Sequence, residues 1–171
     1  AVLKSCMSEL ILHHYPSSPF AEKVRLILGY KQLAWKSVFI PMIMPKPDLT
    51  ALTGGYRKTP VLQIGADIYC DTALICEVLE QLAPRPSIAP EKFKGAAHIV
   101  AQWADSALFT VSMAWNFQPA GVAQVFAGAP AEGVQAFVAD RAAMRGGAPR
   151  MASADAGAVS YTHLTLPTNR E

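Results

Sequence analysis

Ser18-Pro19-Phe20-Ala21 lies between an apolar run that begins at Leu10 and an amphipathic stretch over residues 22–28. Serine is a preferred residue just before a helix, and proline is favoured at the first helical position. The stretch therefore predicts a strand, a tight turn and then a helix that begins near Pro19. Because a helix N-terminus attracts anions, this corner is a candidate binding site.

Two further polar corners follow at the starts of elements. Thr59-Pro60 opens the short apolar run 61–64, and Asp71-Thr72 opens a helical pattern after a turn. A proline before a strand can be cis, and an accessible strand edge beside it can pair with an extended ligand. The apolar positions of the helical pattern are Leu74, Ile75, Val78, Leu79 and Leu82.

These motifs carry a family resemblance. Residues 10 to about 84 resemble the N-terminal domain of a cytosolic glutathione transferase, a branch of the thioredoxin superfamily. Residues 18–25 are similar to the C-P-F-A-E-R segment of the omega class, and Lys46-Pro47-Asp48 is similar to the K-P-E of that class. Ser18 replaces the omega cysteine, as in the serine-type theta and zeta classes. With Ala21 at the second cysteine position, the corner has no thiol for disulfide exchange, so a reacting sulfur would come from a ligand.

The resemblance implies an α/β thioredoxin-like domain, with the order βαβαββα and a mixed four-stranded sheet, followed by an all-α domain. We expect the first domain over 7–84, a proline-rich linker over 85–90 and a partial, truncated helical domain over 91–150. In the second domain, one helical pattern runs from about residue 91 to 115, and weaker patterns cover 120–126 and 131–144.

Both ends are expected to be non-native or disordered. Met7-Ser8-Glu9 resembles a natural start, which makes 1–6 upstream translated sequence. At the other end we exclude 157–171, because 159–171 resembles a translated sequencing-adapter tail of the kind that recurs on metagenomic fragments from bacteria.

The family implies that the corner residue stabilises the thiolate of glutathione. Ser18 is the candidate, because its hydroxyl can donate a hydrogen bond to a sulfur anion at the helix N-terminus. Its alternative role is a simple helix cap. Tyr15 is a rival, since a tyrosine at the end of the first strand has this role in other classes, and Ser17 is expected only to shape the turn.

The resemblance implies that the glutathione tripeptide is held at Thr59-Pro60, at Asp71-Thr72 and by a lysine before the second helix. The resemblance implies main-chain pairing at Thr59-Pro60, capture of the γ-glutamyl end by Asp71-Thr72, and a lysine for the glycyl carboxylate. Each has a purely structural alternative: a strand-initiating proline, a helix cap and a solvated lysine. The glutathione-binding candidates are Phe20, Lys46, Lys58, Thr59, Pro60, Asp71 and Thr72.

Other polar and aromatic residues are expected to have structural roles. Lys23 and Arg25 are predicted to lie on the outer face of the first helix. His13 and His14 alternate to opposite faces of a strand, so they cannot bind one metal together, and no metal is expected. Cys70 is predicted to be a buried, inert thiol. Trp103, Phe109, Trp115 and Phe117 line either an electrophile pocket or the helical core.

Composition limits the partners. In 171 residues, 51% are hydrophobic and 16% are charged, and Lys, Asp, His or Pro interrupts every long apolar stretch, so no transmembrane helix is predicted. The formal charge is +2 and no Lys/Arg stripe is present, which argues against nucleic acid as a partner. Three cysteines without metal-ligand spacing suit a reducing cytosol, so we expect a cytoplasmic protein.

The implied activity is conjugation of glutathione, as co-substrate, to a small hydrophobic electrophile, a detoxification reaction. A glutathione-dependent isomerase, dehalogenase or thiol reductase on the same fold is an alternative, as is a non-catalytic module that binds glutathione or a partner. The family implies a homodimer, although a shortened helical domain would leave a monomer or an aggregating chain as alternatives.

Overall fold

The computed structural model describes residues 8–146, 148, 151–152 and 155–156. Contacts divide the chain into two compact units, with the boundary between Ile88 and Ala89. The segments predicted to be non-native, 1–6 and 157–171, lie outside the described residues.

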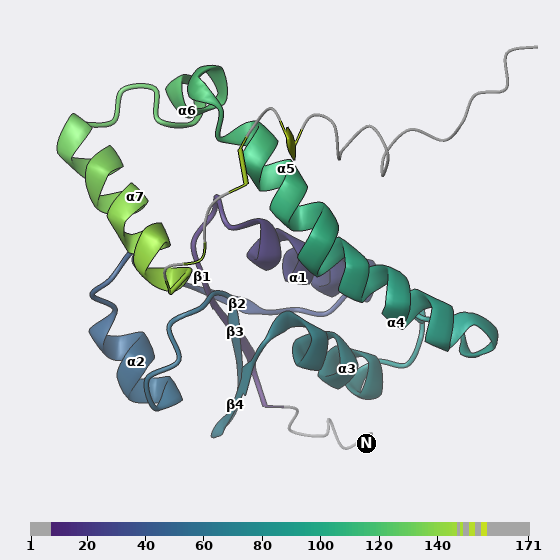
Figure 1. Cartoon of the computed structure of the whole chain (residues 1–171). Coiled ribbons are helices and arrows are strands. Elements are labelled where there is room, and N and C mark those ends of the chain that lie inside the picture. Colours follow the sequence, from purple (N-terminus) through teal and green to yellow (C-terminus); the bar gives the residue numbers. More distant parts are fainter. Residues whose placement is uncertain (1–7, 147, 149–150, 153–154, 157–171) are drawn as a thin grey trace, which may run out of the picture. The chain divides into compact units, whose positions relative to one another are not determined.

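The first unit has the predicted order βαβαββα (Figure 1). Its mixed sheet has four strands in the order β2-β1-β3-β4, with β1 parallel to β2 and antiparallel to β3. β3 pairs antiparallel with β4. The elements are β1 (Leu10–His14), α1 (Pro19–Tyr30), β2 (Lys36–Phe39), α2 (Pro47–Thr53), β3 (Val61–Ile64), β4 (Asp67–Cys70) and α3 (Thr72–Leu82). This topology confirms the thioredoxin-like domain.

Alternation along β1 decides which face of the sheet is covered. Leu10, Leu12 and His14 are buried, whereas Ile11 and His13 are only partly so. The two histidines therefore point to opposite faces, as predicted, and His13 Nε2 lies 3.0 Å from Gln63 Oε1.

The core of the first unit lies between the sheet and the buried stripes of α1 and α3. Burying a whole aliphatic side chain contributes about 1.5–3 kcal/mol, so this cluster accounts for much of the stability of the unit. Its buried members are Leu10, Leu12, Val24, Leu28, Leu62, Ile75 and Leu79.

A buried lysine connects the end of α1 with the end of α3 and the segment that follows it. Lys31 follows α1, and its Nζ donates to Glu80 Oε2 and to the Ala83 carbonyl, each at 2.6 Å, and to the Pro86 carbonyl at 3.0 Å. The Ile88 amide also donates to Glu80 Oε2, at 3.2 Å. The segment predicted as a linker is thus hydrogen-bonded to α1 and α3 as far as Ile88.

The second unit, in its described part, consists of helices. A 3-10 turn (Glu91–Phe93) leads into α4, and a π-helical turn (Ala104–Leu108) continues α4 into α5, which confirms one helical run from about residue 91 to 116. The two weaker patterns also form helices. These helices are α4 (Lys94–Trp103), α5 (Phe109–Asn116), α6 (Pro119–Val125) and α7 (Ala131–Met144).

Aromatic packing and one close backbone approach hold α5, α6 and α7 together. The Phe117 ring stacks on Phe137 at 6.0 Å between centroids, and Phe126 meets Phe137 edge-on at 5.1 Å. For Phe117, core packing is therefore the better of the two predicted roles. A Cβ at Gly121 would lie 1.9 Å from the Asn116 carbonyl oxygen, so this position in α6 admits only glycine without movement. Across the described residues, no helix is both long and apolar enough to span a membrane.

Candidate functional site

Ser18 is buried and caps α1. Its backbone is in the extended conformation of an N-cap residue, and its Oγ accepts a hydrogen bond from the Ala21 amide at 3.2 Å. Its own amide donates to the Tyr15 carbonyl at 3.2 Å and closes the turn. The predicted cap is therefore present. A hydroxyl has one donor and two acceptor positions, so a cap that accepts one bond leaves the proton able to point at a ligand.

Lys46 connects three segments that are distant in sequence. It precedes α2, is buried, and its Nζ donates to Thr59 Oγ1 and to the Arg57 carbonyl, each at 3.3 Å. The same Nζ lies 5.6 Å from the centroid of the Tyr15 ring. The alternative of a solvated lysine is wrong, because burial and these contacts hold the ammonium beside two other candidates. Lys58 is exposed.

The Thr59-Pro60 peptide bond is cis, which confirms the conformation considered for it. Pro60 is fully buried where β3 begins, and Thr59 is half-buried. Two more bonds before proline are cis, Met44-Pro45 and Arg85-Pro86.

Asp71 and Thr72 form the start of α3. Asp71 Oδ1 accepts the Ala73 amide at 2.8 Å, so the cap predicted as an alternative is present, and the residue is exposed. Its φ of 76° is unusual for a residue other than glycine, and such conformations are concentrated at functional sites. Thr72 is buried, and its Oγ1 accepts from Lys23 Nζ at 3.4 Å.

The expected outer-face position of Lys23 and Arg25 is wrong. Lys23 is half-buried and reaches the start of α3, as its bond to Thr72 shows. Arg25 turns back toward β1, where its guanidinium contacts His14, Pro16 and Glu22. Helical periodicity places both residues away from the core stripe, but their long side chains extend around the helix to polar partners.

Known proteins share this fold and part of this sequence. Residues 12–87 match the family model described as "Glutathione S-transferase, N-terminal domain". Residues 12–87 form a glutathione S-transferase N-terminal domain. A GST-like protein from Pseudomonas syringae is 59% identical with a TM-score of 0.64, over 75% of this chain and 44% of that one. The pyrimidodiazepine synthase of Drosophila melanogaster is 32% identical over 76 residues, which are 42% of this chain and 31% of the synthase.

Rice GST1, solved in complex with glutathione, shares the fold at 21% identity and a TM-score of 0.54, with 91% of this chain and 74% of that chain covered. The chain spans less than half the length of both the Pseudomonas protein and the Drosophila enzyme. The likeness to the family therefore concerns the matched part of the chain, residues 12–87.

Tyr56 is a residue of this glutathione S-transferase domain that the sequence did not single out. Burial raises the pKa of its phenol, the charges of Asp71 and Cys70 raise it further, and a hydrogen bond with the Asp71 backbone opposes them. Thr53 Oγ1 donates to the Tyr56 carbonyl at 2.8 Å and fixes the backbone there. An aromatic residue in a loop carries no spacing signal, so only the fold reveals that Tyr56 lies beside Asp71.

Cys70 is half-buried and so less enclosed than the buried position predicted for it. Burial raises the pKa of its thiol, which keeps the thiol protonated near neutral pH. Within the described part of the chain, no cluster of three or more His, Cys, Asp or Glu side chains could hold a metal ion.

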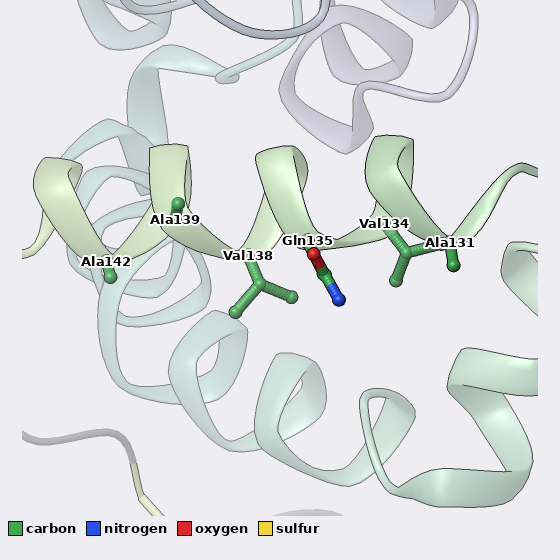
Figure 2. A pocket seen from close by; sticks show the side chains of 6 residues that line it. All are labelled: Ala131, Val134, Gln135, Val138, Ala139 and Ala142. Carbon is green, nitrogen blue, oxygen red and sulfur yellow. The ribbon is translucent and has the colours of Figure 1, made fainter.

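A hollow along α7 in the second unit is separate from these residues. Figure 2 shows that its six lining side chains all come from one face of this helix and that Gln135 is the polar member among small apolar ones. None of the candidate residues lines it. An open face on one helix lacks the several converging polar groups of a ligand site. The lining residues are Ala131, Val134, Gln135, Val138, Ala139 and Ala142.

Proposed function

We propose that the first unit binds glutathione and that Ser18 stabilises the glutathione thiolate for attack on a small hydrophobic electrophile. One observation supports this proposal most strongly. The Ser18 hydroxyl is buried at the N-terminus of α1 and accepts a hydrogen bond from the Ala21 amide, so its own proton can still be donated to a ligand. The bound glutathione of the rice relative supports the choice of ligand.

The chemistry requires an ionised sulfur. An ordinary cysteine thiol has a pKa of about 8.5, so most of it is protonated at neutral pH. A hydrogen bond from Ser18 and the positive end of α1 both favour the anion. Each unit by which they lower the thiol pKa corresponds to about 1.4 kcal/mol of preference for the thiolate. Attack on the electrophile uses the sulfur electron pair to form a carbon–sulfur bond. Either the bond to a leaving group then breaks and that group departs with the pair, or a π bond breaks and its pair moves to the adjacent atom, which takes up a proton.

Charges near the proposed tripeptide site match the ends of glutathione. The Lys46 ammonium lies beside Thr59, where the glycyl carboxylate would be bound. Asp71 is exposed and can pair with the γ-glutamyl ammonium, while Thr72, with Lys23 beside it, and the N-terminal amides of α3 can hold the γ-glutamyl carboxylate. Phe20, Lys58 and Pro60 remain proposed contacts.

The electrophile and the assembly are proposals at the level of the whole protein. We propose a cytoplasmic homodimer with a detoxifying role, as for typical members of the family. An isomerase or a dehalogenase would use the same tripeptide site, whereas a reductase needs a thiol where Ser18 stands.

Calorimetric titration of glutathione into the chain tests binding, with Asp71→Ala as the variant that removes the partner of the γ-glutamyl ammonium. We expect binding by the unaltered chain and at least tenfold weaker binding by the variant, because loss of a charged hydrogen-bonding partner costs about 1.5–3 kcal/mol. If a folded chain binds no glutathione, the proposal is wrong.

Conjugation to an activated aryl chloride then separates catalysis from mere binding. Ser18→Ala is expected to slow conjugation at neutral pH by about tenfold or more, since one donor to a developing anion has been removed. Ser17→Ala is the matched control, because Ser17 is exposed on the same turn. Equal rates for the two variants would favour the non-catalytic module, or Tyr15 as the thiolate partner, which Tyr15→Phe would decide.

A further inference from the structure

Arg25 joins three parts of the corner that carries Ser18. From α1, its Nη1 lies 2.8 Å from His14 Nδ1 on β1, and its Nη2 donates to the Pro16 carbonyl at 2.9 Å. Its Nε donates to Glu22 Oε2 at 2.7 Å, and Nη2 contacts the same oxygen. One planar guanidinium therefore ties a strand, a turn and the first turn of a helix together.

The bond from Arg25 also fixes the state of His14. Arginine only donates, so Nδ1 must accept and the ring proton is on Nε2, which then donates to Ser37 Oγ at 2.7 Å on β2. The imidazole is almost fully buried, with Trp35 and Phe39 edge-on to it. Burial lowers the pKa of His14 and the Arg25 charge lowers it further, which outweighs a hydrogen bond with the Tyr15 backbone that raises it, so the ring stays neutral at neutral pH.

The turn needs this external support. The bond from the Ala21 amide fixes Ser18 Oγ relative to α1, but Thr59 lies just before β3 and Lys46 just before α2. In the proposed complex, Ser18 contacts the sulfur of glutathione and Thr59 contacts its backbone. Both contacts can form together only if α1 has a fixed position relative to the sheet. Within the turn, the Ser18 amide bonds to the Tyr15 carbonyl, and the guanidinium of Arg25 holds the intervening Pro16 carbonyl from outside.

We propose that Arg25 is a positioning residue that places the Ser18 hydroxyl against the glutathione sulfur by holding the Pro16 carbonyl and His14 to the start of α1. This inference rests on the proposed function, because it concerns the same thiolate. Displacing a donor by a fraction of an ångström weakens its bond to the anion, whereas contacts at the tripeptide ends are unaffected.

Arg25→Lys in the full chain is the test. Lysine keeps the positive charge but lacks the planar guanidinium that contacts His14, Pro16 and Glu22. The readout is the ultraviolet absorbance of the bound glutathione thiolate as a function of pH, which needs no electrophile. We expect the thiol pKa to rise by about one unit, a tenfold change in the ionisation constant, while the Kd for glutathione changes by less than about threefold. Arg145→Lys, at an exposed arginine after α7, is the matched control and should match the unaltered chain.

A second variant covers the case in which Arg25→Lys does not fold. Glu22→Gln replaces a half-exposed carboxylate with an amide of the same shape and so weakens the interaction with the Arg25 guanidinium. We therefore expect the thiol pKa to rise by a smaller amount than in Arg25→Lys. If glutathione binds and ionises equally in the unaltered chain and in folded Arg25 or Glu22 variants, the positioning role is wrong and the proposed function stands. If the unaltered chain binds glutathione without forming thiolate, or does not bind it, the proposed function fails and the role of Arg25 fails with it.

Discussion

At the scale of single residues, Ser18 and Lys46 differ in how far the sequence specifies their contacts. Ser18 caps α1 through Ala21 while its hydroxyl proton can still be donated, so a structural and a chemical role are compatible in one group. Lys46 is buried beside Thr59 and Tyr15, although a lysine before a helix is usually solvated. The cap of Ser18 is thus local, whereas the surroundings of Lys46 depend on segments distant in sequence.

Replacing Ser18 by cysteine tests the electrostatics of the α1 N-terminus directly. A cysteine thiol at a helix N-terminus has a lowered pKa, so Ser18→Cys is expected to be alkylated at pH values well below those needed for Cys70, whose pKa burial raises. Peptide mass spectrometry after brief alkylation at several pH values compares both thiols in one sample. The same variant should gain thiol-transfer activity with glutathione disulfides.

Similar reactivity of the new cysteine and Cys70 would contradict an anion-stabilising corner. Ser17→Cys serves as the control, since it places a thiol on the exposed side of the same turn, where we expect an ordinary pKa.

At the scale of elements, close packing and buried polar contacts join the end of one helix to a neighbouring helix. Gly121 allows α6 to approach the last carbonyl of α5, at Asn116, and Lys31 joins the end of α1 to Glu80 in α3. Both contacts explain residues whose type is otherwise unfavourable, a glycine inside a helix and a lysine inside a core.

Gly121→Ala is expected to destabilise the second unit by about 1–3 kcal/mol, because a methyl group would overlap the Asn116 carbonyl. Gly133→Ala in α7 is the control: nothing lies within 4 Å of its added Cβ, so we expect a gain of about 0.5–1 kcal/mol from helix propensity. Urea denaturation followed by fluorescence of Trp103 and Trp115, in a Trp35→Phe background, measures both. A neutral Gly121→Ala would show that the two helices are not in this close contact.

The Lys31–Glu80 pair predicts a dependence of stability on pH. Partial burial opposes ionisation of Glu80, but hydrogen bonds from Lys31, Ser87 and Ile88 and the charge of Lys31 outweigh it and lower its pKa. Because the folded pKa lies below the unfolded one, the pair stabilises the fold fully above the unfolded pKa, about 4.3 for Glu. This contribution is lost as the pH falls from that value through the lowered folded pKa.

Glu80→Gln should therefore lower the unfolding free energy by about 1–3 kcal/mol at pH 7 and have a smaller effect at low pH, where the native carboxylate is itself protonated. Denaturation of both proteins across pH 3–7 checks this expectation. Glu77→Gln, at an exposed position one turn earlier in α3, is the control. An equal effect of Glu80→Gln at every pH would contradict the role of the ion pair.

At the scale of the whole molecule, the sequence predicts what local chemistry determines. Helix caps, prolines and apolar periodicity were sufficient for the starts of α1, β3 and α3, because each of these signals acts within a few residues, whereas the βαβαββα order was expected from the family resemblance. The contacts of Arg25 with His14, of Lys23 with Thr72 and of Tyr56 with Asp71 could not be predicted, since each depends on how two elements pack.

The two-unit organisation predicts that the first unit carries the glutathione site alone. All the residues proposed to hold the tripeptide, and the whole core cluster around Leu12, lie before the boundary at Ile88. A fragment of residues 7–88 should therefore unfold cooperatively and bind glutathione with a Kd within about threefold of that of the full chain, a difference of roughly 0.7 kcal/mol. Binding by the full chain but not by the folded fragment would show that the second unit contributes to the site.

Thiolate absorbance of glutathione bound to the unaltered chain and to Ser18→Ala gives the thiol pKa in each and decides whether Ser18 stabilises the anion. We expect a thiol pKa at least about one unit lower in the unaltered chain than in free glutathione, with most of that shift lost in Ser18→Ala while glutathione still binds. A bound thiol with the same pKa as free glutathione, or an equal shift in Ser18→Ala, would contradict it.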